Sequence, residues 1–182
     1  LHPTAGLDLD GDPVANLQAN IRRVQRLTSN PFGIALYLPH PRIEEMIGAA
    51  TQDGVHIAIT YGGSAALYTG TLKEHDIVVL HQVSTVRHAR GAEAQGVDIV
   101  IADGFEGGGL RGPDKVSTMV LVPQMVASVS IPVIASGGVV DARGVVAARA
   151  LGAQGVQIGS RFVATQECNS HQNFKEALVA AI

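Results

Sequence analysis

The sequence predicts an α/β fold, a (β/α) barrel of the TIM type, and three observations support this class. Short runs of β-branched residues alternate with amphipathic stretches along most of the 182 residues. The runs begin at similar spacing, at positions 31, 55, 77, 98, 132 and 155, which indicates repeated βαβ units and a parallel sheet. They are apolar on both faces, as expected for strands that lie between a barrel interior and a ring of helices.

The individual elements follow from these runs and from the residues that flank them. Six strands are expected in PFGIALYL, VHIAITYGG, IVVLHQV, DIVIADG, PVIASGG and GVQIGSRF. Five helices are expected over residues 13–28, 42–52, 84–95, 117–129 and 141–151, where apolar residues recur at helical spacing. Ser84, Ser117 and Asp141 stand at expected N-caps, and Gly96 and Gly152 at expected C-caps.

Six strands are fewer than the eight of a complete TIM barrel. The polar segment 1–12 supplies neither a strand nor a helix, so residues 1–182 are expected to form a single partial barrel domain. Either a longer chain or a second protomer would complete the wall. Exposed strand edges and apolar faces predict that the chain associates with itself, as a homo-oligomer.

Composition excludes several classes of protein. The 13 basic and 16 acidic residues offer no basic stripe for nucleic acid. No apolar run approaches the ~18 residues of a membrane span. A lone cysteine, Cys168, forms no internal disulfide, and the histidines form no metal set, so a cytoplasmic protein without a metal site is expected.

Small residues after the last two strands indicate an anion site. In this fold, functional groups lie at the carboxyl ends of the strands, and phosphates commonly bind after the last two. The segments Ser136-Gly137-Gly138 and Gly159-Ser160 would let backbone N–H groups approach a phosphate, aided by the helix N-terminus that follows. The alternative is that these glycines only make tight turns.

A long glycine-rich loop follows the fourth strand, from Gly104 to Asp114. Loops of this length in α/β domains are often functional, although a loop without function is the alternative. Asp103 precedes the loop and Glu106 lies near its start, and hydrogen bonds to loop backbone are a better expectation for these carboxylates than acid–base work. Among the histidines, His81 could face a ligand at a strand end, and His171 lies in a polar segment expected to cap the barrel rim.

The segments IADGFEGGGLRG, VPQMVASVSIPVIASGGVVDARGVVAARALGAQGVQIGSRFVATQE and CNSHQNFKEAL resemble the nitronate monooxygenase family, formerly called 2-nitropropane dioxygenases. This family includes FMN-dependent enoyl reductases. The resemblance implies a TIM barrel with FMN at its mouth, and an oxidoreductase that oxidises alkyl nitronates with flavin and O2. It further implies that cofactor contacts fall at Gln82, Asp103, Ser136, Gly137, Gly138, Gly159 and Ser160.

The sequence departs from the family pattern at three positions. Leu110 stands where the family has a catalytic histidine, Ala35 replaces an asparagine that contacts flavin, and Gln82 replaces a lysine. Leucine transfers no proton, so no catalytic residue is assigned, and any activity is expected to favour nitronates over neutral nitroalkanes. The alternatives are an FMN-dependent NAD(P)H enoyl or quinone reductase of the same family, and a degenerate fragment without catalysis.

Overall fold

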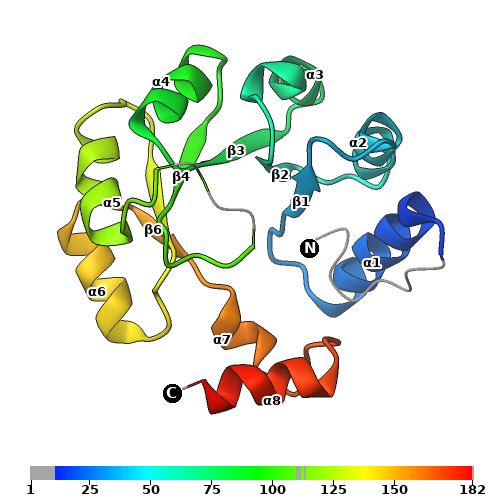
Figure 1. The fold of residues 1–182 in the computed structure, drawn as a ribbon. Coiled ribbons are helices and arrows are strands. Elements are labelled where there is room, and N and C mark those ends of the chain that lie inside the picture. The colour runs from blue at the N-terminus through cyan, green and yellow to red at the C-terminus, as the bar shows by residue number, and fades with distance from the viewer. Residues whose placement is uncertain (1–10, 110–111, 113, 182) are drawn as a thin grey trace. The chain divides into compact units, whose positions relative to one another are not determined.

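The computed structural model describes residues 11–109, 112 and 114–181. Figure 1 shows their helices and strands in chain order. The chain divides into two compact units. The first comprises Leu1–Gln82 and Gly91–Ile99, and the second comprises Val83–Arg90 and Val100–Ile182.

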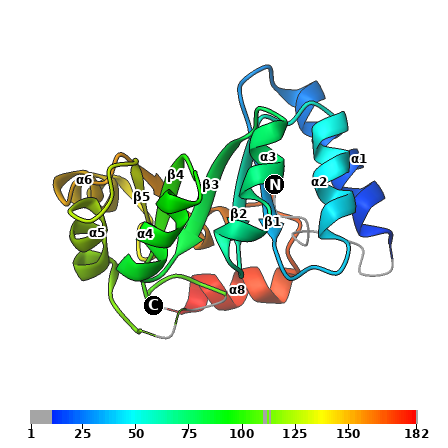
Figure 2. The ribbon, with the colours of Figure 1, turned by 90° about the horizontal axis from the view of Figure 1, so that it is seen from above.

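The first unit is built on three parallel strands. They are β1 (Ile34–Tyr37), β2 (Ile57–Tyr61) and β3 (Val78–Val83). Its helices are α1 (Pro13–Leu27), α2 (Ile43–Gln52), the 3-10 turn η1 (Ala65–Leu67) and α3 (Thr69–Glu74). The Asp12 carboxylate caps α1 by accepting hydrogen bonds from the amides of Val14 and Ala15. Helices α1 and α2 lie side by side, as Figure 2 shows.

The second unit contains three further parallel strands and carries most of the expected site. The strands are β4 (Ile99–Asp103), β5 (Val133–Ser136) and β6 (Gly155–Gln157). Its helices are α5 (Thr118–Val126), α6 (Ala142–Ala150), α7 (Ser160–Val163) and α8 (Gln172–Ala180). Helix α4 (Val86–Ala94) runs from the second unit into the first.

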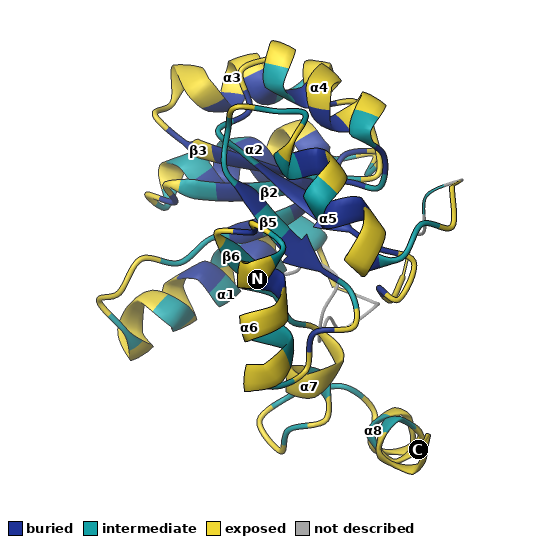
Figure 3. Ribbon diagram, turned by 90° about the vertical axis from the view of Figure 1, so that its left-hand side faces the viewer, coloured by how far each residue is buried: buried dark blue, intermediate teal, exposed yellow. Residues whose placement is uncertain are grey.

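The core of the second unit is aliphatic, as the composition predicts. One face of β4 and β5 carries Val100, Ala102, Val133 and Ala135, each at most 3% exposed. Three apolar side chains of α5 are also buried, namely Leu121, Val122 and Met125. Strands β4 and β5 are mainly buried. In contrast, helix α8 is exposed or partly exposed along its whole length, as Figure 3 shows.

The six expected strands and five expected helices are confirmed, with differences at their ends. Gly96 and Gly152 have left-handed φ angles of 83° and 96°, as the predicted C-caps require. The prediction of Ser84 as an N-cap is wrong, because the adjacent Thr85 hydroxyl accepts the hydrogen bond from the His88 amide. The last strand is shorter than expected because residues 160–163 turn into α7.

Helices α7 and α8 were not among the expected elements. Helix α7 has only four residues, and α8 has no buried residue, so neither carries a clear apolar face that the sequence would reveal. Within the described residues, no helix combines the length and apolarity needed to cross a membrane.

Candidate cofactor site

Three polar side chains stand in one row at the carboxyl ends of β4, β5 and β6. Asp103 pairs in register with Ser136, which pairs in turn with Gln157. Residues in register on neighbouring parallel strands project from the same face of the sheet. The Ser136 hydroxyl donates a 2.9 Å hydrogen bond to Asp103 Oδ1, and both residues are buried. The structure therefore brings together two of the residues that the sequence selected, from strands that lie 33 positions apart.

Gln157 is a member of this row that the sequence reasoning did not select. Its Oε1 atom is buried and has no hydrogen-bond partner among the described residues. A buried acceptor left in this state costs about 1–3 kcal/mol, so the atom is suited to accept a hydrogen bond from a ligand. Its position in the sequence could have indicated it, because Gln157 ends the strand that precedes Gly159 and Ser160.

The two glycines after β5 are required by the local geometry. Gly137 and Gly138 have φ angles of 98° and 73°, in the region that favours glycine. A Cβ atom on Gly137 would lie 2.9 Å from both the Gly107 nitrogen and the Thr118 hydroxyl oxygen. The backbone of this turn thus packs directly against the glycine-rich loop and the start of α5.

The surroundings of Gly159 differ from those of Gly137. Gly159 precedes α7, and a Cβ atom added to it would meet no described atom within 4 Å. Its φ angle of −109° is accessible to any residue. A glycine here is therefore not needed for internal packing among the described residues, which leaves room for a ligand beside its backbone.

Glu106 fixes the glycine-rich loop to the start of α5. Its Oε2 atom accepts hydrogen bonds from the Thr118 amide at 2.9 Å and from the Thr118 hydroxyl at 3.0 Å. Partial burial alone would raise the pKa of Glu106, but hydrogen bonds from the Thr118 amide, its own amide and the Thr118 hydroxyl together hold that pKa below its ordinary value. The carboxylate also supplies the cap of α5, because the Ser117 side chain makes no capping hydrogen bond.

Helix α6 offers less to an anion than its position after Gly138 suggests. The Asp141 carboxylate already accepts hydrogen bonds from the amides of Arg143 and Gly144 in its first turn. An anion after β5 would therefore bind the amides of the glycine turn itself. A contribution of the α6 N-terminus to the phosphate site stays a prediction.

The remaining sequence-selected residues are not members of this row. Gln82 is on β3 and Ala35 is on β1, both in the first unit, and Leu110 lies outside the described residues. His81 is buried, with its Nδ1 atom 2.7 Å from the Thr60 hydroxyl. His171 caps α8, where its Nδ1 atom accepts a hydrogen bond from the Asn173 amide.

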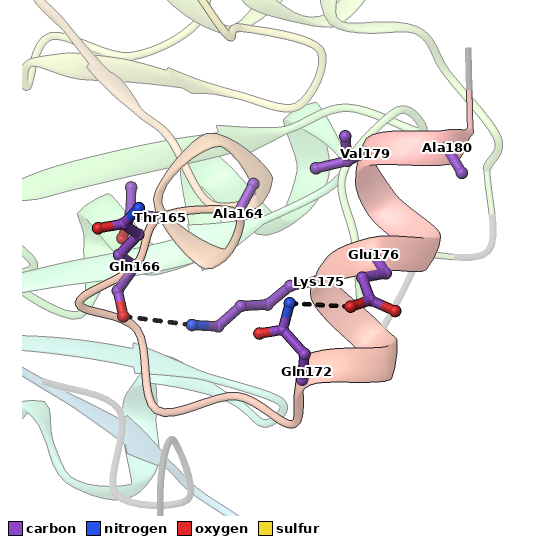
Figure 4. A pocket seen from close by; sticks show the side chains of 8 residues that line it. All are labelled: Ala164, Thr165, Gln166, Gln172, Lys175, Glu176, Val179 and Ala180. Atoms are coloured by element: carbon purple, nitrogen blue, oxygen red, sulfur yellow. Dashed lines mark hydrogen bonds between the residues drawn. The ribbon is translucent and has the colours of Figure 1, made fainter.

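A cavity of about 430 Å³ lies between the end of α7 and helix α8 (Figure 4). Ala164, Gln172, Lys175 and Val179 are among the residues that line it, and none of the sequence-selected cofactor residues does. In the part of the chain that the structure describes, no cluster of histidine, cysteine and carboxylate side chains could hold a metal ion.

Comparison with solved structures identifies the fold. The chain superimposes on the structure of FabK from Thermotoga maritima, a TIM barrel, with a TM-score of 0.88 and 38% identity. The match covers 94% of this chain and 55% of that one. The predicted TIM-barrel class is therefore confirmed.

Curated relatives and a family model identify the protein family. A probable nitronate monooxygenase of Staphylococcus haemolyticus is 33% identical over 90% of this chain and 58% of its own length. A (3aS,4S,5R,7aS)-5-hydroxy-7a-methyl-1-oxo-octahydro-1H-indene-4-carboxyl-CoA dehydrogenase of Rhodococcus jostii is 34% identical over 90% of this chain and 46% of its own length. The chain thus spans about half the length of these relatives. The family model described as nitronate monooxygenase matches residues 10–182. On this evidence, the chain belongs to the nitronate monooxygenase family.

Proposed function

We propose that this chain binds FMN and forms the phosphate-binding part of a flavin-dependent oxidoreductase. The observation that carries the proposal is the row of Asp103, Ser136 and Gln157, which ends beside two glycine segments on neighbouring strands. This arrangement fits FMN, because the molecule combines a phosphate with polyol hydroxyls and ring N–H groups. The glycine segments could bind the phosphate of FMN. Gln157 Oε1, which has no hydrogen-bond partner among the described residues, could accept a hydrogen bond from a hydroxyl or ring N–H of the same molecule.

The residues of the row and of the two glycine segments have distinct roles in this proposal. The Gly137 and Gly138 amides, together with Gly159 and Ser160, would hold the phosphate, because backbone N–H groups and a hydroxyl suit an anion. Gln157 Oε1 would accept a hydrogen bond from a hydroxyl or ring N–H of the ligand. When bound, FMN supplies two-electron oxidation and reduction. Asp103, which accepts from Ser136, would orient that serine next to the phosphate turn.

We propose alkyl nitronates, oxidised with O2, as the preferred substrates. Leu110 can neither accept nor donate a proton, so a neutral nitroalkane, which must first lose one, should react about 10²- to 10⁴-fold more slowly than with a general base. A nitronate is already deprotonated. Steady-state rates with both forms at neutral pH test this, and equal turnover would contradict it.

The second candidate is reduction of an enoyl thioester or quinone with NAD(P)H. The 38% identity to FabK and the 34% identity to the indene-4-carboxyl-CoA dehydrogenase of Rhodococcus jostii support it. Anaerobic oxidation of NAD(P)H in the presence of an enoyl thioester or a quinone separates the two candidates. Turnover there, without turnover of nitronates in air, would favour the reductase.

Gly159→Asp tests the cofactor proposal directly. A Cβ atom at this position meets no described atom within 4 Å, so the fold should survive, whereas the carboxylate should repel the phosphate and weaken FMN binding about 100-fold or more. The measurement is FMN titration followed by flavin fluorescence and visible absorption. Gly91→Asp is the matched control, because Gly91 is an exposed glycine on α4 with open space around it. A wild-type chain that binds no FMN would overturn the proposal.

A further inference from the structure

Thr118, the first residue of α5, makes several close contacts with the turn after β5. No pattern in the sequence predicted these contacts. It is 9% exposed. Its hydroxyl oxygen lies 2.9 Å from the Gly137 carbonyl oxygen, 3.2 Å from the Ser136 carbonyl oxygen and 3.0 Å from Glu106 Oε2. One threonine therefore joins the glycine-rich loop to two consecutive peptide groups of the turn after β5.

The hydroxyl carries a single hydrogen, and three acceptors lie close enough to share it: Glu106 Oε2 and the carbonyl groups of Ser136 and Gly137. Glu106 Oε2 already accepts the Thr118 amide at 2.9 Å. The Gly137 carbonyl is the nearest of the three acceptors to the hydroxyl, and the Ser136 carbonyl belongs to the adjacent peptide. Hydrogen bonds in which one hydrogen is shared between acceptors are common in proteins. The Thr118 hydroxyl therefore links the Glu106 carboxylate to both carbonyl groups of the turn.

The direction of the two carbonyls determines the direction of the amides. Peptide bonds in the described chain are trans, so the N–H of each peptide points away from its C=O. The Ser136 and Gly137 carbonyls point to Thr118, and the Gly104 amide also donates to the Ser136 carbonyl at 2.9 Å. The Gly137 and Gly138 N–H groups therefore point away from α5. Neither donates a hydrogen bond to another group in the described part of the chain.

The close packing of this corner restricts it to these residue types. A Cβ atom on Gly104 would overlap the Thr118 hydroxyl, and a Cβ atom on Gly137 would approach it to 2.9 Å. Both glycines are thus needed for the hydroxyl to reach the turn. The turn would otherwise be free to rotate its peptide groups, because glycine has little conformational preference of its own.

We propose that Thr118 is a positioning residue for phosphate recognition: its hydroxyl holds the Ser136–Gly138 peptides so that two amides face the phosphate of FMN. Thr118 itself touches no ligand in this arrangement, and Glu106 keeps it in place through its amide. The inference rests on the proposed binding of FMN. It adds a residue on another helix to the site, and it assigns that residue a role specific to the phosphate.

The test compares FMN with riboflavin, which lacks the phosphate. Dissociation constants for both are measured by fluorescence with the wild-type chain, Thr118→Val and Thr118→Ser. Valine keeps the shape without the hydroxyl, and serine keeps the hydroxyl without the methyl group. We expect Thr118→Val to weaken FMN binding about 10-fold while riboflavin binding changes less than about 3-fold. Thr118→Ser should restore the preference for FMN.

The outcomes separate the two proposals. If the wild-type chain binds neither compound, the proposed function fails. If it prefers FMN and Thr118→Val keeps the same preference, the positioning role of Thr118 is wrong while the proposed function stands. An equal loss of FMN and riboflavin binding would also overturn the positioning role, because it indicates general damage. Thr118→Ala replaces the valine variant if urea unfolding shows that valine is not tolerated.

Discussion

At the scale of the residue, the proposed role of Gln157 in FMN binding predicts a cost in the stability of the fold. Its buried Oε1 atom lacks a partner among the described residues, an arrangement that favours ligand binding over folding. Gln157→Met, which removes the amide at similar volume, should leave the free energy of unfolding unchanged or raise it by up to about 1 kcal/mol. The same change should weaken FMN binding about 10-fold.

Urea unfolding and FMN titration measure the two effects of Gln157→Met. Gln154→Met is the control, since Gln154 is exposed and lies just before the same strand. A Gln157→Met variant that is clearly less stable and binds FMN normally would show that the amide serves the fold.

The Glu106 carboxylate gives the second residue-scale prediction. Its pKa is lower in the folded chain than its ordinary value of 4.5, so the folded state favours the ionised form. The stability that this confers is present above about pH 5 and is lost as the pH falls through the lowered pKa. The difference in unfolding free energy between the wild type and Glu106→Gln should therefore be constant near neutral pH and shrink below pH 4.5. Chemical unfolding at several pH values measures this, and a difference that grows in acid would refute it.

At the scale of the element, substitutions at Gly96, which follows α4, and at Gly152, which follows α6, distinguish the cost of backbone strain from the cost of crowded packing. Gly96 has open space around it, so Gly96→Ala should cost only the left-handed conformation, about 1–2 kcal/mol. Gly152→Ala should cost more, because its Cβ atom would lie 2.9 Å from Val126 Cγ1 at the end of α5. Thermal unfolding measures both.

Two further variants complete this comparison. Gly91→Ala, inside α4, should stabilise by about 0.5–1 kcal/mol, because alanine is the better helix former. Val126→Ala should recover part of the loss in Gly152→Ala by removing the crowded methyl groups. Equal costs at Gly96 and Gly152 would contradict the packing contribution.

At the scale of the whole molecule, ligand linkage offers a test independent of catalysis. A ligand that binds only the folded chain stabilises it by about 2.7 kcal/mol when present at 100 times its dissociation constant. We expect FMN to raise the unfolding midpoint of the wild type and to leave that of Gly159→Asp nearly unchanged. Inorganic phosphate should compete with FMN, and no shift with FMN would contradict the assignment of the site.

Self-association is the second expectation at this scale. Phe162, Phe174 and Val179 on α7 and α8 are 54–63% exposed. Apolar side chains exposed in this way favour association. Sedimentation velocity at increasing concentration should show species larger than the monomer, and Phe162→Ser with Phe174→Ser should reduce them. A monomer at all concentrations would be evidence against the expectation.

The sequence by itself determined the repeated strand–helix order, the TIM-barrel class, the resemblance to the nitronate monooxygenase family and the residues Asp103, Ser136, Gly137 and Gly138. These follow from periodicity and from local motifs, which are properties of neighbouring positions. The tertiary structure decided the contacts between distant segments. The strand register places Gln157 beside Ser136, the packing of α5 places the Thr118 hydroxyl beside the Gly137 carbonyl, and the Asp141 carboxylate accepts from amides in the first turn of α6. The physical reason is that register and the direction of a peptide group are set when segments pack together, so no window of the sequence contains them.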